Sequence, residues 1–438
     1  MEQSGDALKA PSVGSTDQSP VSAPIDPGPK DQTKILFLAP RPPYPPDKGD
    51  KIRSYHFLRH MASAGTVDII CCVDRSDPPN VVEELGKYCR RVHCEPCGRL
   101  GLLSAGLRAI LRSEPVTVAR VLRRGIYRTM DQWMKDTAYD LIFAYTSATG
   151  PYCETGSGVP LVVDFVDCDS AKWIALGEQS RGLRRWIYRR EGHGLRNWEQ
   201  RLLRSKACAV AITETEARLL RGGDSAGEVT VIPNGVDMAR WQPVARNRRD
   251  FCKPRTTALW VGGLFYKPYA DAIQWFLNQV WPRVRKRVPT AGFTAIGADP
   301  PRLLRRFHGR DGVRIAGYRP SLDADMIEAA VGVVPLLIAP GLQNKILDFM
   351  AAGVPVVATR VAVDGTNAMP DEHVLVCDDS EGFAEAMVRL LKDPPFGQAM
   401  ADRAWAWVSR TYSWERVFGS LDNVLGGIVM RSGSVKRW

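Results

Sequence analysis

Short apolar runs alternate with amphipathic stretches along most of the chain. Runs that are apolar throughout are typical of strands buried on both faces of a parallel sheet. The strand candidates, most of them mainly apolar, fall into two groups, which we predict to form two sheets: 35–39, 67–73, 91–96, 141–144, 161–165, 207–213 and 229–233, then 258–262, 292–296, 313–316, 331–335, 355–358 and 374–377. Strands that alternate with helices indicate the α/β class, with two Rossmann-like, doubly wound parallel sheets.

The same pattern sets the expected domain boundaries. Residues 1–33 are rich in Pro, Ser, Gly and Asp and contain no aromatic residue, so we expect a disordered tail. The first domain is expected over 34–244 and the second over 258–412, with the polar stretch 245–257 as the linker between them. Residues 413–438 are expected to form a final helix and tail.

The stretch 331–359 carries the strongest local signal for chemistry. Two predicted strands enclose a glycine turn at Gly341, then Asn344 and Lys345, and then a short apolar-periodic helix over 346–352. The unpaired N–H groups and the positive dipole end of such a helix suit a phosphate, and Lys345 adds a full charge. Asp348 lies one turn after Asn344, where a carboxylate can accept hydrogen bonds from ribose hydroxyls. The local prediction is a nucleoside diphosphate site.

The first strand of the second domain also ends in a glycine turn. Gly262 and Gly263 permit close approach of the backbone to a ligand, and they also suit a tight strand–helix turn. Lys267 follows and is predicted to reach the diphosphate, with a solvated loop lysine as the alternative. Ligands of open parallel sheets collect at the carboxyl ends of the strands, where Lys345 is also expected.

Two carboxylates follow the predicted strand 161–165. Asp167 and Asp169 form an Asp-x-Asp pattern that can bind metals, but three residues arise easily by chance, so we expect no metal. Because they end a strand of the first domain, we predict that they orient acceptor hydroxyls. The alternative is that Asp169 and Ser170 cap the helix that follows. A cysteine cluster near His93 has a single CxxC and lacks the second ligand pair of a zinc site.

Four segments together carry a resemblance to a known family. They are ILFLAPRPPYPPDKGDKIRSYHFLRHM (35–61), DFVDCDSAKW (164–173), IPNGVDMARWQP (232–243) and LWVGGLFYKPYADAIQWFLNQVWP (259–282). With the 331–359 stretch, they resemble the retaining GT-B glycosyltransferases of family 4. Within that family, they are similar to a subgroup found beside bacterial exopolysaccharide loci and associated with the PEP-CTERM/exosortase protein-sorting system. The resemblance covers about 34–427.

The resemblance implies two domains that face each other across a cleft, with a nucleotide-diphospho-sugar donor in the second domain and a glycan or polyprenyl-linked acceptor in the first. No cofactor is implied. The leaving diphosphate is expected to take the acceptor proton in a front-face, retaining hexosyl transfer, with positive charge from Lys267 and Lys345. Gly49 is expected to face the donor diphosphate, or else to form a turn before the first helix.

This chain departs from the family at three positions. Pro340 stands where the family has its first Glu, Asp348 replaces the second Glu, and Gly263 replaces an Arg. These changes leave two alternatives open beside an active transferase. One is a catalytically silent GT-B protein that acts as a binding or scaffold partner, and the other is a sugar-nucleotide epimerase.

The charge and hydropathy of the chain limit the kinds of partner that it can bind. The formal net charge of +11 suits nucleic acid, anionic membranes or anionic ligands, but no nucleic-acid-binding module is found. Neither a signal peptide nor an apolar run long enough to cross a bilayer is present, so we predict a cytoplasmic protein. Two basic, amphipathic stretches, 99–128 and 181–206, predict peripheral association with an anionic membrane. Ordinary domain helices are the alternative.

Overall fold

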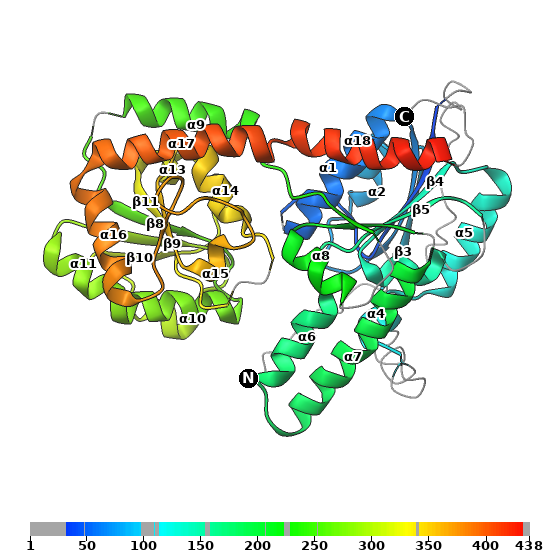
Figure 1. The fold of residues 1–438 in the computed structure, drawn as a ribbon, viewed down its shortest axis with the longest axis horizontal. Helices are drawn as coiled ribbons and strands as arrows, with labels where there is room; N and C mark the ends of the chain where they lie inside the picture. The colour runs from blue at the N-terminus through cyan, green and yellow to red at the C-terminus, as the bar shows by residue number, and fades with distance from the viewer. Residues whose placement is uncertain are drawn as a thin grey trace, which may run out of the picture.

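Two α/β domains lie side by side in the computed structural model (Figure 1). The structure describes residues 32–47, 49–97, 109, 114–153, 158–205, 207–222, 228–251, 253–338 and 341–431. Both sheets are parallel throughout, with helices between successive strands. The predicted fold class is therefore confirmed. Every predicted strand is present, with its ends within two residues of the expected positions.

The first domain contains a seven-stranded sheet in the order β3-β2-β1-β4-β5-β6-β7. Strand order reverses between β1 and β4, and the carboxyl ends at such a point form a natural binding crevice. The strands are β1 (Lys34–Ala39), β2 (Thr66–Val73), β3 (Arg91–Pro96), β4 (Leu141–Tyr145), β5 (Leu161–Asp164), β6 (Cys208–Ala211) and β7 (Val229–Val231). The helices are α1 (Gly49–Ala64), α2 (Val81–Gly86), α4 (Val116–Val121), α5 (Arg124–Asp136), the 3₁₀ helix Ser147–Cys153, α6 (Asp169–Glu178), α7 (Gly182–Arg204) and α8 (Glu214–Arg221).

The second domain repeats this topology with six strands in the order β10-β9-β8-β11-β12-β13. The strands are β8 (Thr257–Val261), β9 (Gly292–Ile296), β10 (Val313–Ala316), β11 (Ala329–Val334), β12 (Val356–Ala358) and β13 (Leu375–Val376). The helices are α9 (Met238–Asp250), α10 (Lys267–Trp275), the π-helix Phe276–Val280, α11 (Trp281–Arg287), α12 (Arg302–Arg305), α13 (Asp323–Glu328), α14 (Asn344–Ala351), α15 (Arg360–Val363), α16 (Ser380–Lys392) and α17 (Pro394–Tyr412).

The expected linker 245–257 is wrong over its first half, because α9 continues to Asp250. Trp241 and Val244 of this helix are buried in the core of the second domain. Arg248 is also buried, and it donates to backbone carbonyls of that domain, those of Met326, Ile327, Ala329 and Gly353. The chain therefore passes between the domains before α9, and α9 is part of the second domain.

The end of the chain returns to the first domain. Helix α18 (Trp414–Arg431) lies against the first domain beside α1, whereas α17 covers the second (Figure 1). Its apolar face joins the core of the first domain through Trp414, Val417, Leu421 and Leu425. A β-carbon on Gly235, at the junction, would lie 2.3 Å from the Trp414 ring, so this tight approach requires glycine. The expected tail 1–33 lies outside the described residues except for Gln32 and Thr33.

Candidate functional site

Helix α14 begins at the junction of the two domains, and its far end is firmly fixed. Gly353 has φ +71°, and the bonds from Gly353 N to Met350 O (3.0 Å) and from Val354 N to Phe349 O (2.8 Å) form a Schellman motif. At the other end, the N-cap residue Gln343 makes no side-chain hydrogen bond to the helix. The first turn therefore keeps donors for an incoming anion.

The ammonium group of Lys345 lies in an aromatic cage. Its Nζ is 4.0 Å from the centroid of the Trp260 ring and 3.5 Å from that of Tyr269. The stem of Lys345 is half-buried, but Nζ itself is buried and has no hydrogen-bond partner among the described residues. Burial holds the pKa of Lys345 well below its usual range. Gly262 forms the wall of the cage, because its β-carbon position lies only 3.1 Å from Nζ.

Asn344 connects the second domain to the first. Its Oδ1 accepts a hydrogen bond from Asn234 Nδ2 (3.1 Å), and its Nδ2 lies 3.6 Å from the β-carbon position of Gly49. Gly49 starts α1, so the N-termini of α1 and α14 approach each other here. The structure thus brings together Gly49 and Asn344, two of the residues expected near the donor.

Behind this contact, Arg53 organises the first domain. The side chain is fully buried and donates from Nε to Asp164 Oδ2 (2.7 Å). Its Nη1 reaches Pro233 O (2.9 Å) and Asn234 Oδ1 (3.3 Å), whereas Nη2 is buried without a hydrogen-bond partner among the described residues. Arg53 therefore ties α1 to the end of β5 and to the junction residue that holds Asn344.

Asp348 lies one turn into α14, as predicted. Its Oδ1 accepts a hydrogen bond from Trp241 Nε1 (3.0 Å), which comes from α9. Burial raises the pKa of Asp348 to about 6, against the opposing effect of the Trp241 bond. The carboxyl is thus held in a fixed orientation by a neutral donor and not by a cation.

Carboxylates of the first domain face the Gly341 loop of the second. A β-carbon on Gly341, which has φ +72°, would lie 3.1 Å from Asp167 Oδ1 and 3.8 Å from Glu216 Oε1. Burial raises the pKa of Asp167, and it raises that of Glu216 to about 7. Asp167 is also close enough to raise the pKa of Tyr269, which adds to the larger effect of burial. Asp167 therefore lies near the cage of Lys345 and near Gly341.

The backbone before these carboxylates is strained. Val166, after β5, has φ +64°, and Thr146, after the neighbouring β4, has φ +70°. A β-branched residue in the left-handed region is a genuine outlier, and such strain persists where the surroundings impose it, often at functional sites. The two residues mark the same edge of the sheet as Asp167.

Asp169 is the first residue of α6, and its pKa is raised to about 6 by burial. The capping alternative is wrong, because other carboxylates take the N–H groups of this helix end. Glu216 accepts from Cys168 N (2.6 Å), and Glu199 accepts from Ser170 N (3.0 Å) and Ser170 Oγ (2.5 Å). The Asp169 side chain is left to line a cavity.

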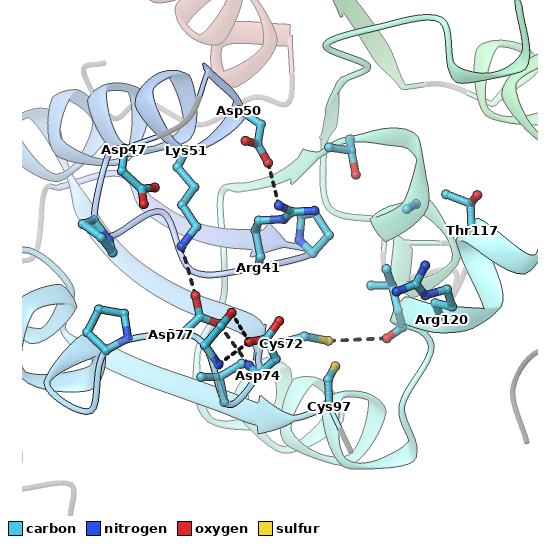
Figure 2. A pocket seen from close by; sticks show the side chains of 18 of the residues that line it. Arg41, Asp47, Asp50, Lys51, Cys72, Asp74, Asp77, Cys97, Thr117 and Arg120 are labelled. Carbon is cyan, nitrogen blue, oxygen red and sulfur yellow. Dashed lines mark hydrogen bonds and ion pairs between the residues drawn. The ribbon is translucent and has the colours of Figure 1, made fainter. Parts of the chain in front are cut away.

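That cavity has a volume of about 580 Å³ and lies in the first domain, at the carboxyl ends of β1, β2 and β4. Its walls are strongly polar (Figure 2), with Lys51 bonded to Asp77 (3.0 Å) and Arg41 paired with Asp50 (3.4 Å). Further lining residues include Asp74, Thr117, Arg120, Asp169 and the thiols of Cys72 and Cys97. Alternating carboxylates and cations suit a ligand with many hydroxyl groups.

Two predicted site residues lie apart from this arrangement. The Lys267 side chain is 84% exposed, and its ammonium pairs with Asp271 (2.5 Å), so it does not join the cage of Lys345. Gly263 contacts its own loop, where a β-carbon would lie 2.8 Å from the Phe265 ring. Pro340 lies outside the described residues.

Several residues of this arrangement were not predicted from the sequence, because their partners lie far away in the chain. These are Arg53, Glu199, Glu216, Trp260 and Tyr269. One signal was available for Arg53, because Asp164 ends an otherwise apolar strand and a buried acid requires a partner. No comparable signal identifies Trp260 and Tyr269 as a cage, since both fit a core pattern.

Two family models match the chain. The glycosyl transferase 4-like domain matches residues 51–235, and the domain of glycosyl transferases group 1 matches residues 255–393. Among curated proteins, the chain is 28% identical over 243 residues to a glycogen synthase of Mycobacterium tuberculosis, covering 52% of this chain and 55% of that protein. It is 26% identical over 171 residues to a 44.6 kDa protein of the cps region of Klebsiella pneumoniae, covering 37% and 44%. The chain spans about half the length of the curated relatives it matches.

Solved structures share the fold. Sucrose-phosphate synthase from Thermosynechococcus elongatus superposes with a TM-score of 0.66 at 18% identity, covering 90% of this chain and 99% of that one. Anabaena HepE, in complex with UDP and glucose, gives 0.62 at 16% identity, covering 90% and 100%. The described residues contain no helix that is long and apolar enough to cross a membrane. With both domain models matched in order, this chain belongs to the glycosyltransferases of the GT-B type.

Proposed function

We propose that the protein transfers a hexosyl group from a nucleotide-diphospho-sugar to a glycan acceptor, with retention and without a divalent metal. The buried, unpartnered ammonium of Lys345 at the start of α14 is the observation that carries this proposal. The charged form of Lys345 is costly here without a partner, and an arriving diphosphate both stabilises that charged form and uses the open helix terminus. HepE, a structural neighbour, is described with bound UDP.

The other residues follow from this placement. Asp348, held by Trp241, accepts hydrogen bonds from the ribose, and Gly262 and Gly341 admit the backbone close to the donor. Asp167 and Asp169 orient the acceptor hydroxyl at the edge of the first sheet. Charge that develops on the leaving diphosphate is stabilised by Lys345, and by Lys267 if it leaves Asp271.

We place the reaction at the inner face of the cytoplasmic membrane, with a polyprenyl-linked acceptor in exopolysaccharide biosynthesis. The resemblance to the exosortase-associated subgroup supports this placement, as does the polar cavity on the acceptor side. The alternatives are a silent scaffold protein, which the absent glutamate at 340 favours, and a sugar-nucleotide epimerase.

Thermal denaturation with uridine, guanosine and deoxythymidine diphosphates tests the donor site. One diphosphate is expected to stabilise the protein, by about 2.7 kcal/mol at one hundred times its Kd. Sugar release from the matching donors then separates the alternatives. Binding without transfer or hydrolysis supports the scaffold, and conversion of the donor to an epimer supports the epimerase. Absence of binding to all three diphosphates would contradict the proposal.

A further inference from the structure

Helices α6 and α7 form a hairpin that projects from the first domain, away from its sheet (Figure 1). Glycines let the two helices approach closely. A β-carbon on Gly177 would lie 2.8 Å from Arg189 Cγ, and one on Gly192 would lie 2.7 Å from Ile174 Cγ1. The hairpin is therefore a tightly packed unit whose shape is set by helix–helix contact.

The tip of the hairpin, defined as Leu176 to Arg189, exposes apolar side chains. Leu183 is 72% exposed, Trp186 60% and Ile187 45%. Their spacing of three and four residues puts all three on one face of α7. On the opposite helix, Leu176 is 42% exposed. Exposed apolar residues scattered singly are ordinary, but a face of this kind at a projecting tip points to a partner.

Arginines surround this face. Arg181, Arg184, Arg185 and Arg189 are exposed, and no ion pair found among the described residues engages them. The segment 180–190 contains no Asp or Glu. Within the tip, the only acid is Glu178, at the end of α6. The tip therefore carries a net positive charge, which complements an anionic surface.

We propose that this tip docks onto an anionic lipid bilayer, with Trp186 and Leu183 at the level of the headgroups and the arginines on lipid phosphates. A face that mixes Trp and Leu with arginine is typical of helices that lie in a membrane interface. Guanidinium groups bind phosphate in a bidentate manner, and each adds attraction close to the surface.

Docking in this way also orients the site. Helix α6 runs from the tip to Asp169, which lines the polar cavity, and its ten residues rise about 15 Å. A sugar carried on a lipid diphosphate would project from the bilayer toward that cavity. This orientation rests on the proposed function, whereas docking itself is measured without donor or acceptor.

Flotation of the full-length protein with vesicles tests the proposal. Vesicles of phosphatidylcholine alone are compared with vesicles that also contain phosphatidylglycerol, at low and high salt. Wild-type protein is expected to float only with the anionic vesicles and to be released by salt. Arg184→Gln with Arg185→Gln is expected to lower partitioning about 30-fold. Leu183→Ser with Trp186→Ser is expected to abolish flotation at intermediate salt.

Matched control variants test whether the loss of flotation is specific to the tip. Arg302→Gln with Arg306→Gln removes two exposed charges from the second domain, and Tyr318→Ser removes an exposed aromatic ring there; both are expected to float like wild type. Each variant is used only if its melting temperature matches that of wild type. Unchanged flotation of both tip variants, no flotation of wild type, or binding of the tip to another protein in place of lipid would overturn the proposal. If wild type floats but binds no nucleotide, the proposed function fails and the docking proposal stands.

Discussion

The buried ammonium of Lys345 gives the sharpest prediction. Two aromatic faces, at 4.0 and 3.5 Å, attract the cation by about 0.5–2 kcal/mol, whereas the desolvation of an ammonium ion costs several kcal/mol. The balance is unfavourable to the charge, which is why burial holds the pKa of Lys345 well below its usual range. Replacement of Lys345 by Met keeps the apolar stem and removes the ionisable group.

The sign of the pH effect follows from linkage. Because the pKa of Lys345 is lower in the folded protein than in the unfolded chain, the unfolded chain binds more protons between the two values. The free energy of unfolding therefore rises with pH between the folded-state and unfolded-state pKa values of Lys345. The full destabilisation by the buried charge is present only below the folded-state pKa. Lys345→Met is expected to raise the melting temperature of the nucleotide-free protein at neutral pH and to remove this rise.

Nucleotide binding reverses the effect, because a diphosphate beside Nζ favours the charged form. UDP binding by wild type is expected to take up protons, and Lys345→Met is expected to take up fewer and to bind about 10- to 150-fold more weakly. This corresponds to about 1.5–3 kcal/mol for a charged hydrogen bond. Titration calorimetry in two buffers of different ionisation enthalpy measures the uptake.

Lys267→Met is the matched control, since Lys267 is exposed and paired with Asp271, and it is expected to keep the proton uptake of wild type. Unchanged UDP affinity and unchanged proton uptake in Lys345→Met would show that Lys345 does not bind the diphosphate.

Three further predictions concern the same site. Asp348→Ala is expected to weaken UDP binding by about 1–3 kcal/mol and to leave pyrophosphate binding unchanged, because its partner is the ribose; equal loss for both ligands would show another role. Glu216, whose pKa is about 7, lies beside Asp167, so its ionisation above pH 7 places a second negative charge near the donor. UDP affinity is expected to fall as pH rises through 7, and Glu216→Gln is expected to reduce this fall; an unaltered profile would exclude Glu216. Sugar transfer is expected to survive EDTA, since Lys345 and the helix terminus supply the positive charge, and activity that returns only with added magnesium or manganese would contradict this.

The fold could be predicted because the position of each strand follows from the local pattern of apolar and polar residues. Strands such as β4 and β12 are short, apolar and buried along their whole length, and each is followed by a threonine, so their limits follow from the sequence. Helix α9 shows where this fails. Its buried positions, Trp241, Val244 and Arg248, are separated by exposed polar residues, and one of them is an arginine whose partners are carbonyls of distant segments. Because the end of this helix is so polar, the sequence pattern favoured a linker over a helix from residue 245.

The candidate site divides in the same way. The turn at Gly341, the position of Asp348 and the presence of α14 are local features that sequence spacing was enough to predict, although α14 starts two residues before the predicted helix 346–352. The Arg53–Asp164 bond joins residues 111 apart, and the Asn234–Asn344 bond joins residues 110 apart. Which side chains meet at such a bond depends on tertiary packing, which periodicity does not encode. The same holds for Lys267, which spacing placed near the donor but which pairs with the residue one turn along its own helix.

The missing glutamate at position 340 bears on whether the protein is active or silent. Pro340 offers no carboxylate, but Asp167 and Glu216 of the first domain approach the adjacent Gly341 loop from the other side of the junction. Their pKa values are raised by burial, so at least one carboxyl there can remain protonated near neutral pH and donate to a sugar oxygen. Strained backbone at Val166 and buried acids that face the Gly341 loop each lower stability in the absence of a ligand, and a scaffold protein gains nothing from them. The cost is understandable if the acids contact a substrate, and this favours the active transferase over the silent alternative.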